Sequence, residues 1–155
     1  MIPSSHHGNW RGASRVWWDG PRRDADLTIA VDATHVAYSY RPERMPLQTG
    51  AIKLSADTAG VRADWVVGTE TAANAMHLQG VLQDGLICLY DVPPEGEVAE
   101  WHLQIEIDAR DPEYFSIRVF RAAPGEAHLL ALDLTCARSG ECVVHPARRE
   151  LWLPP

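Results

Sequence analysis

Apolar and polar residues alternate along most of the chain. In residues 101–108, Trp101, Leu103, Ile105 and Ile107 form one set, and His102, Gln104, Glu106 and Asp108 form the other. Because successive strand residues point to opposite sides, this alternation predicts a strand with one buried face. Similar runs occupy 10–18, 27–31, 36–40, 52–54, 61–67, 76–82, 86–90, 115–121 and 129–136. The polar set, Glu106 and Asp108 included, is expected to face water.

Short turn signals separate these runs. Asp84-Gly85 predicts a tight hairpin, residues 57–60 predict another, and prolines at 42 and 46 break the chain into a loop. Only residues 70–75 suggest a short helical turn. About nine strands without crossover helices predict an all-β, antiparallel meander. Closing the sheet removes its edges, so we expect a lipocalin-like up-and-down β-barrel of 8–10 strands whose interior holds one small ligand.

Length and charge narrow the classes of partner. The 155 residues correspond to one domain over 1–155, with 1–7 as a mobile terminus and 139–155 as a C-terminal extension. A net charge of −7 disfavours nucleic acid and anionic membranes, because both are bound through excess Lys and Arg. A small molecule, as ligand or substrate, remains the expected partner. The sequence leaves the oligomeric state open, with a homodimer as one option.

The start of the chain and the cysteines bear on the compartment. No secretory signal pattern and no apolar run of 18 residues is found, so we expect a cytoplasmic protein. Cys88, Cys136 and Cys142 lack the paired spacing of a zinc site. The sequence therefore predicts no metal.

Several short motifs resemble the calycin superfamily, and in particular lipocalin-like bacterial proteins of unknown function related to nitrobindin-type barrels. Gly8-Asn9-Trp10 is similar to the Gly-x-Trp opening, and Arg138 follows the last strand where that family places an Arg against the Trp. Residues 101–107, 111–113 and 123–126 are similar to its later half. The resemblance covers most of 8–138, and it implies a barrel floor sealed by Trp10 and Arg138.

Haem is the cofactor that this resemblance suggests. The glycine-rich stretch that follows Gly-x-Trp in nitrobindin-like haem proteins is missing, and residues 68–71 replace a mid-chain patch of some relatives. His145 lies late in the chain, where such a barrel offers an axial ligand. We therefore expect no cofactor, with haem as the lesser alternative.

Aromatic residues on the apolar sides of the strands are the candidate ligand-binding wall: Tyr38, Tyr40, Trp65, Trp101 and Phe115. Either they fill the core, or some of them line a pocket, since small-molecule sites combine aromatic walls with a few polar groups. We take the pocket as the working hypothesis, with a small, largely apolar molecule as its ligand.

A cofactor-independent enzyme, such as a cyclase, isomerase or hydrolase, is the alternative function. Its acid/base residues would be His77 with Tyr90 or Glu70, because an inward His77 would titrate near neutral pH. Either alternate face of residues 75–79 can point inward, and no common catalytic motif is present. The sequence therefore leaves open whether the protein is an enzyme.

Overall fold

A computed structural model of the chain describes residues 1–17, 20–68, 75–92, 102–123 and 125–138. Its elements are the 3-10 turn η1 (Ser4–His6) and the strands β1 (Gly8–Val16), β2 (Arg23–Val31), β3 (His35–Tyr40), β4 (Gln48–Asp57), β5 (Gly60–Val67), β6 (Met76–Gln83), β7 (Leu86–Asp91), β8 (His102–Asp108), β9 (Tyr114–Ala122) and β10 (Leu129–Ala137). No helix in these ranges is long and apolar enough to cross a membrane.

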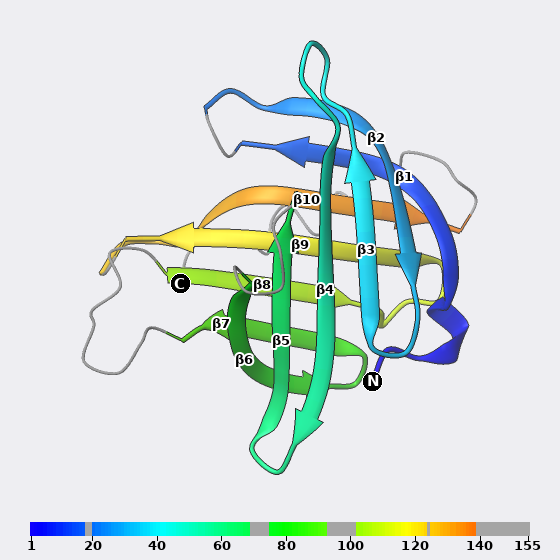
Figure 1. Cartoon of the computed structure of the whole chain (residues 1–155), viewed down its shortest axis with the longest axis vertical. Helices are drawn as coiled ribbons and strands as arrows, with labels where there is room; N and C mark the ends of the chain where they lie inside the picture. Colours follow the sequence, from blue (N-terminus) through cyan, green and yellow to red (C-terminus); the bar gives the residue numbers. More distant parts are fainter. Residues whose placement is uncertain (18–19, 69–74, 93–101, 124, 139–155) are drawn as a thin grey trace.

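The ten strands form one closed antiparallel barrel in which each strand pairs with its neighbours in sequence. Closure comes from β1, which pairs with β2 on one side and with β10 on the other. In Figure 1 the strands β2–β5 run across the direction of β7–β10, while β1 and β6 curve between the two halves. The predicted all-β, up-and-down barrel is confirmed.

Glycines occupy the curved part of both joining strands. A Cβ on Gly12 of β1 would lie 2.0 Å from the carbonyl oxygen of Thr135, and one on Gly80 of β6 would lie 1.7 Å from that of Cys88. No other residue fits this close approach of backbone to backbone, and glycine at a bend is a common way to curve a sheet. Close packing of backbone against backbone therefore requires glycine at both positions.

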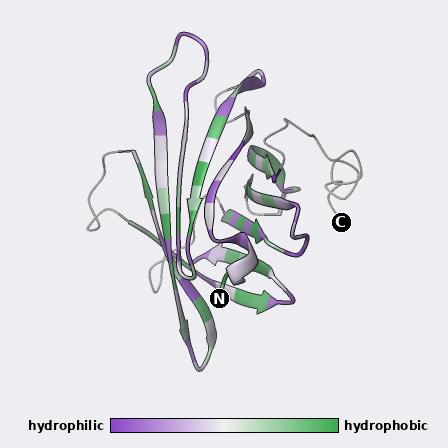
Figure 2. Cartoon of the chain, turned by 90° about the vertical axis from the view of Figure 1, so that its right-hand side faces the viewer, coloured by the Kyte–Doolittle hydropathy of each residue, from purple (hydrophilic) through white to green (hydrophobic). Residues whose placement is uncertain are grey.

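The predicted strands are present, and their inward residues form the core (Figure 2). Leu27, Ile29 and Val31 of β2 are buried, and the residues between them are exposed, which is the pattern of a half-buried strand. The Asp84-Gly85 hairpin is also present, with positive φ at both residues.

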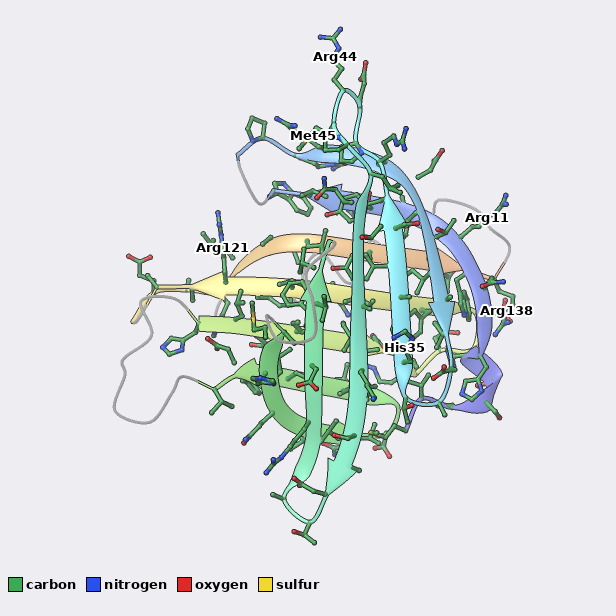
Figure 3. The ribbon with its side chains drawn as sticks, viewed as in Figure 1. Arg11, His35, Arg44, Met45, Arg121 and Arg138 are labelled. Atoms are coloured by element: carbon green, nitrogen blue, oxygen red, sulfur yellow. The ribbon has the colours of Figure 1, made fainter. Side chains whose placement is uncertain are left out.

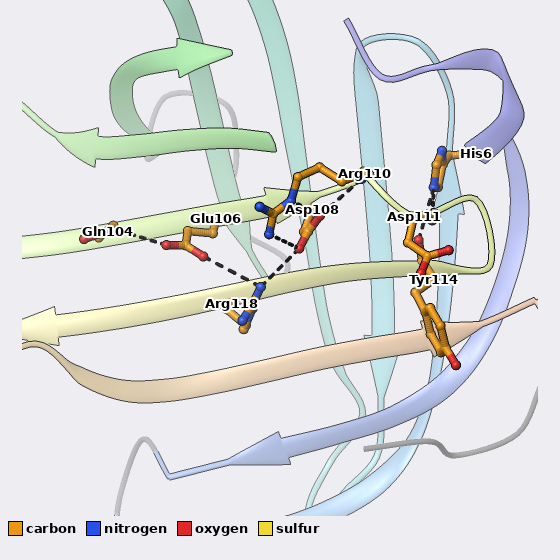
Figure 4. A network of polar contacts seen from close by, with 8 residues as sticks. All are labelled: His6, Gln104, Glu106, Asp108, Arg110, Asp111, Tyr114 and Arg118. Carbon is orange, nitrogen blue, oxygen red and sulfur yellow. Dashed lines mark hydrogen bonds and ion pairs between the residues drawn. The ribbon is translucent and has the colours of Figure 1, made fainter. Parts of the chain in front are cut away.

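The prediction that Glu106 and Asp108 face water is wrong. They are 8% and 1% exposed, and Arg118 on the neighbouring strand is 3% exposed. Nη2 of Arg118 lies 3.4 Å from Oδ2 of Asp108 and 3.8 Å from Oε2 of Glu106, and Arg110 pairs with Asp108 at 2.9 Å (Figure 4). Alternation identified one apolar face of β8 but could not show that its charged face is also buried.

The charged residues continue across the neighbouring strands. Asp133 of β10 lies in register between Arg15 of β1 and Arg118 of β9. Nη2 of Arg15 donates to Oδ2 of Asp133 at 2.7 Å, and the Thr135 hydroxyl donates to Oδ1 at 2.6 Å. Basic and acidic side chains thus alternate from β1 to β8, so each buried charge lies beside one of opposite sign.

Burial raises the pKa of Glu106 above its ordinary value of 4.5, and the nearby Arg118 offsets this only in part. A carboxyl with a raised pKa binds its proton more tightly in the folded protein than in the unfolded chain. Its contribution therefore favours folding below the ordinary pKa and is lost as the pH rises through the raised pKa.

We expect Glu106→Gln to stabilise the protein relative to wild type at neutral pH, because the neutral amide avoids burying a carboxylate. Near pH 4 the two proteins should converge, since Glu106 is then protonated. Urea unfolding followed by tryptophan fluorescence across this range measures the difference. Glu126→Gln, at an exposed position, is the control. If Glu106→Gln and wild type differ in free energy of unfolding by the same amount at neutral pH and near pH 4, the raised pKa of Glu106 is contradicted.

Candidate functional site: a pocket at the open end of the barrel

One end of the barrel is closed by an aromatic cluster. Trp10 is 3% exposed, and its ring lies 6.1 Å from that of Phe115 and 5.7 Å from that of His6. The guanidinium of Arg138 sits over the Trp10 ring, 4.3 Å from its centroid, and donates to the backbone carbonyls of Ser5 and Pro112 (Figure 3). We call these four side chains the floor. Trp10 and Arg138 are thus in contact, in the arrangement that the resemblance implies.

The N-terminal residues pack against this floor, contrary to the expected mobile terminus. His6 is 2% exposed, and its Nε2 is 2.8 Å from the carbonyl oxygen of Asp111. Nε1 of Trp10 donates to the carbonyl of His6 at 2.8 Å, and Ile2 is buried in the core. No periodic pattern along the chain indicates this contact, because it joins a turn to a distant hairpin.

A pocket of about 210 Å³ lies toward the opposite end of the barrel. Its described lining comes from β1–β5 and β10 and from the loops before β2 and β4: Val16, Pro21, Arg23, Tyr38, Tyr40, Pro42, Met45, Gln48, Trp65, Val67 and Leu132. The wall is mainly apolar and aromatic with few polar groups, which is the usual composition of a small-molecule site.

Tyr38 and Trp65 are joined within this wall. Nε1 of Trp65 donates to the Tyr38 hydroxyl at 3.0 Å, and the Tyr40 ring stacks on the Tyr38 ring with centroids 6.3 Å apart. Gly50, the register partner of Tyr38, provides the space, since a Cβ there would lie 2.2 Å from the phenol. Burial raises the pKa of Tyr38, so the phenol keeps its proton and stays neutral.

The proposed aromatic wall separates into three groups. Tyr38, Tyr40 and Trp65 line the pocket together. Phe115 is fully buried but packs with Trp10 and His6, so it belongs to the floor, and its assignment as pocket lining is wrong. Trp101 lies outside the described residues. Alternation placed all of these on the inner face but could not assign them to one end of the barrel.

The candidate acid/base residues do not meet in the pocket. The side chain of His77 is 74% exposed, and its Nδ1 lies 2.6 Å from Oδ1 of Asp64 on the outer face. Tyr90 is 47% exposed and shares that face with its register partner Gln79. The inward option for His77 is therefore wrong. Glu70 lies outside the described residues, so no acid/base group within the described lining supports the enzyme hypothesis.

Sequence reasoning missed the lining residues at the mouth of the pocket. Arg23 and Val16 are register partners at the open ends of β2 and β1, and Gln48 begins β4. Figure 3 shows Met45 beside the tip of the β3–β4 loop. The prolines at 42 and 46 marked this segment as a loop, but only the closed barrel brings it over the ends of β1 and β2.

The residues present do not fit haem or a metal ion. The described lining contains no histidine or cysteine, and His145 lies outside the described residues. Over the part of the chain that the structure describes, no group of three or more His, Cys, Asp or Glu is placed to hold a metal. We derive no chemistry through either group.

A second hollow, of about 580 Å³, lies on the outer side of β1–β5. Its centre is a row of small register partners, Ala30, Ala37 and Ala51, next to Val66. It is larger, but the row at its centre is composed of small apolar side chains that carry no hydrogen-bonding group. We therefore place the candidate site in the smaller, aromatic pocket.

No family model matches the chain, and no curated protein matches it. The closed ten-stranded antiparallel barrel is consistent with calycin-like folds. The candidate function therefore depends on the geometry of the pocket.

We expect Gly50→Ala to destabilise the protein by about 1–3 kcal/mol, the usual cost of overpacking. The added methyl group would displace the Tyr38 phenol and break its hydrogen bond with Trp65. Urea unfolding measures the loss, and Ala51→Ser, on the outer face of the same strand, is the control. Unchanged stability would show that Tyr38 does not need this space.

We expect Arg138→Ala to lower the free energy of unfolding by about 0.5–1 kcal/mol, the range for an exposed cation–π contact. The affinity of the pocket for a small molecule should not change, because the floor lies at the opposite end of the barrel from the pocket. Arg11→Ala, an exposed arginine on β1, is the control. A change in ligand affinity for Arg138→Ala alone would contradict the division into floor and pocket.

Proposed function

We propose that this protein binds one small, largely apolar molecule at the open end of its barrel. The observation that carries the proposal is the aromatic wall of Tyr38, Tyr40 and Trp65 around a cavity of about 210 Å³. Three large rings from β3 and β5 border a cavity instead of filling it. Well-packed interiors leave few voids of this size, so a preformed cavity favours binding over simple core filling.

The dimensions favour a compact ligand. An apolar cavity of about 150 Å³ is enough to bind benzene. The pocket is somewhat larger and is open at the mouth, so it suits one substituted ring or a small fused pair. Flat ligands gain the most affinity, because the stacked rings of Tyr38 and Tyr40 present aromatic surface to them.

Tyr38 supplies a polar group that would orient the ligand. Its oxygen accepts a hydrogen bond from Trp65, and a phenol hydroxyl can also donate one. A ligand with a carbonyl or similar oxygen would accept that hydrogen bond inside the pocket. The proposed ligand is therefore apolar with at least one hydrogen-bond acceptor.

The resemblance to calycin barrels of the nitrobindin-related type agrees with this proposal, since the shared architecture encloses a ligand cavity. The net charge of −7 also favours a small molecule over nucleic acid. We propose binding and not catalysis, because His77 and Tyr90 lie on the outer face.

Filling the mouth of the pocket tests the proposal. Val67 lines the mouth and is 40% exposed, so Val67→Trp should fold and should occupy the space that a ligand needs. Val81→Trp, at a 58% exposed position on β6 outside the described lining, is the matched control. The probe is naphthalene-2-carboxamide, which is flat and neutral and carries a carbonyl.

We expect wild type and Val81→Trp to bind this probe with equal affinity, and Val67→Trp to bind it at least about tenfold more weakly, a loss of 1.4 kcal/mol. Isothermal titration calorimetry measures the affinities, and far-ultraviolet circular dichroism confirms folding. Equal affinity for all three proteins, or no binding to wild type, would refute the proposal.

A further inference from the structure

Arg23 occupies an unusual position on the inner side of the barrel. The inward residues of β2 are Arg23, Ala25, Leu27, Ile29 and Val31, so Arg23 continues an otherwise apolar row to the mouth. It lines the pocket, and it is the one charged residue among the described lining residues. The Arg23 side chain thus places a fixed positive charge beside an apolar cavity.

The guanidinium of Arg23 has no carboxylate partner among the described residues. Its recorded contact is from Nη1 to the sulfur of Met45, and a thioether is a weak acceptor. The preceding residue, Arg22, differs: its Nε and Nη2 donate to the two carboxylate oxygens of Asp24 at 2.7 and 2.6 Å. Asp24 is thus paired with Arg22, and the donors of Arg23 are left to other acceptors.

The segment that carries Arg23 and the β3–β4 loop is less acidic than the protein as a whole. Residues 20–48 carry four arginines and four carboxylates and are neutral overall, whereas the chain as a whole has a net charge of −7. Arg41 and Arg44 are exposed on the β3–β4 loop, and Arg44 extends from its tip (Figure 3). An anion that approaches this opening therefore meets less repulsion than the net charge of the whole chain would produce.

We propose that the ligand is an amphipathic anion, with a flat apolar body between the aromatic rings and a carboxylate or similar head paired with Arg23. This inference rests on the proposed function and names the class of its ligand. The head remains at the mouth because an anion is costly to bury, whereas the body reaches the apolar wall. A guanidinium suits a carboxylate, since its parallel N–H donors match the two oxygens.

Two probes of the same shape test this ligand class. Naphthalene-2-carboxylate and naphthalene-2-carboxamide share the ring system and differ in charge. We expect wild type to bind the carboxylate about three- to tenfold more tightly, as for a partly exposed charge-assisted hydrogen bond. Calorimetry on the full chain measures both affinities at low and high salt, and added salt should weaken only the carboxylate.

Two neighbouring arginines provide the matched variants. Arg23→Gln should lose the preference for the carboxylate, so that it binds both probes with affinities within about twofold of each other. Arg22→Gln removes one positive charge from the preceding residue and should keep the preference for the carboxylate. If only Arg23→Gln removes the preference for the carboxylate, that preference is due to contact with Arg23 and not to the total charge near the mouth.

The outcomes separate the two proposals. If wild type binds both probes equally, or if Arg22→Gln and Arg23→Gln reduce the preference to the same extent, the anionic class is refuted while apolar binding stands. If wild type binds neither probe, the proposed function fails, and the ligand class fails with it.

Discussion

The pairing of β1 with both β2 and β10 is the constraint on which the rest of the structure depends. Without it, the first and last strands would be open edges, and an antiparallel sheet of this size would expose unpaired backbone groups. Closure also puts Trp10, near the start of the chain, beside Arg138, just after the last strand. The floor is thus a direct consequence of joining the two ends of the meander.

Closure also gives the barrel two different ends, one filled by side chains and one that holds a cavity. At one end, His6, Trp10, Phe115 and Arg138 fill the interior. At the other, the β1–β2 and β3–β4 loops surround a cavity, because Gly50 leaves room for Tyr38 to lie against the wall. One group of aromatic residues therefore fills the floor and another lines the pocket, although all of them lie on inner faces.

The outer surface of the barrel is not uniform either. On β8–β10, Glu106, Arg118 and Asp133 are buried charges that lie beside charges of opposite sign. On β6 and β7, the outward Val81 and Tyr90 are exposed. Arg118 and Asp133 tolerate few substitutions, because removing either charge leaves its buried neighbours unpaired, whereas the carboxylate of Glu106 is itself costly to bury. The β6–β7 face has no such restriction.

Alternation and turn chemistry determined the class of fold by themselves, since the strand period of two and the Asp84-Gly85 hairpin are local properties. They also identified the residues of the inner face, Tyr38, Tyr40 and Trp65 among them. Only the tertiary structure decided at which end of the barrel each aromatic residue lies, that His77 faces outward, and that Glu106 and Asp108 are buried. It also brought Arg23 and Met45 together at the mouth. These features depend on strand register, curvature and the approach of distant loops, which are set by packing between segments and leave no periodic signal in the sequence.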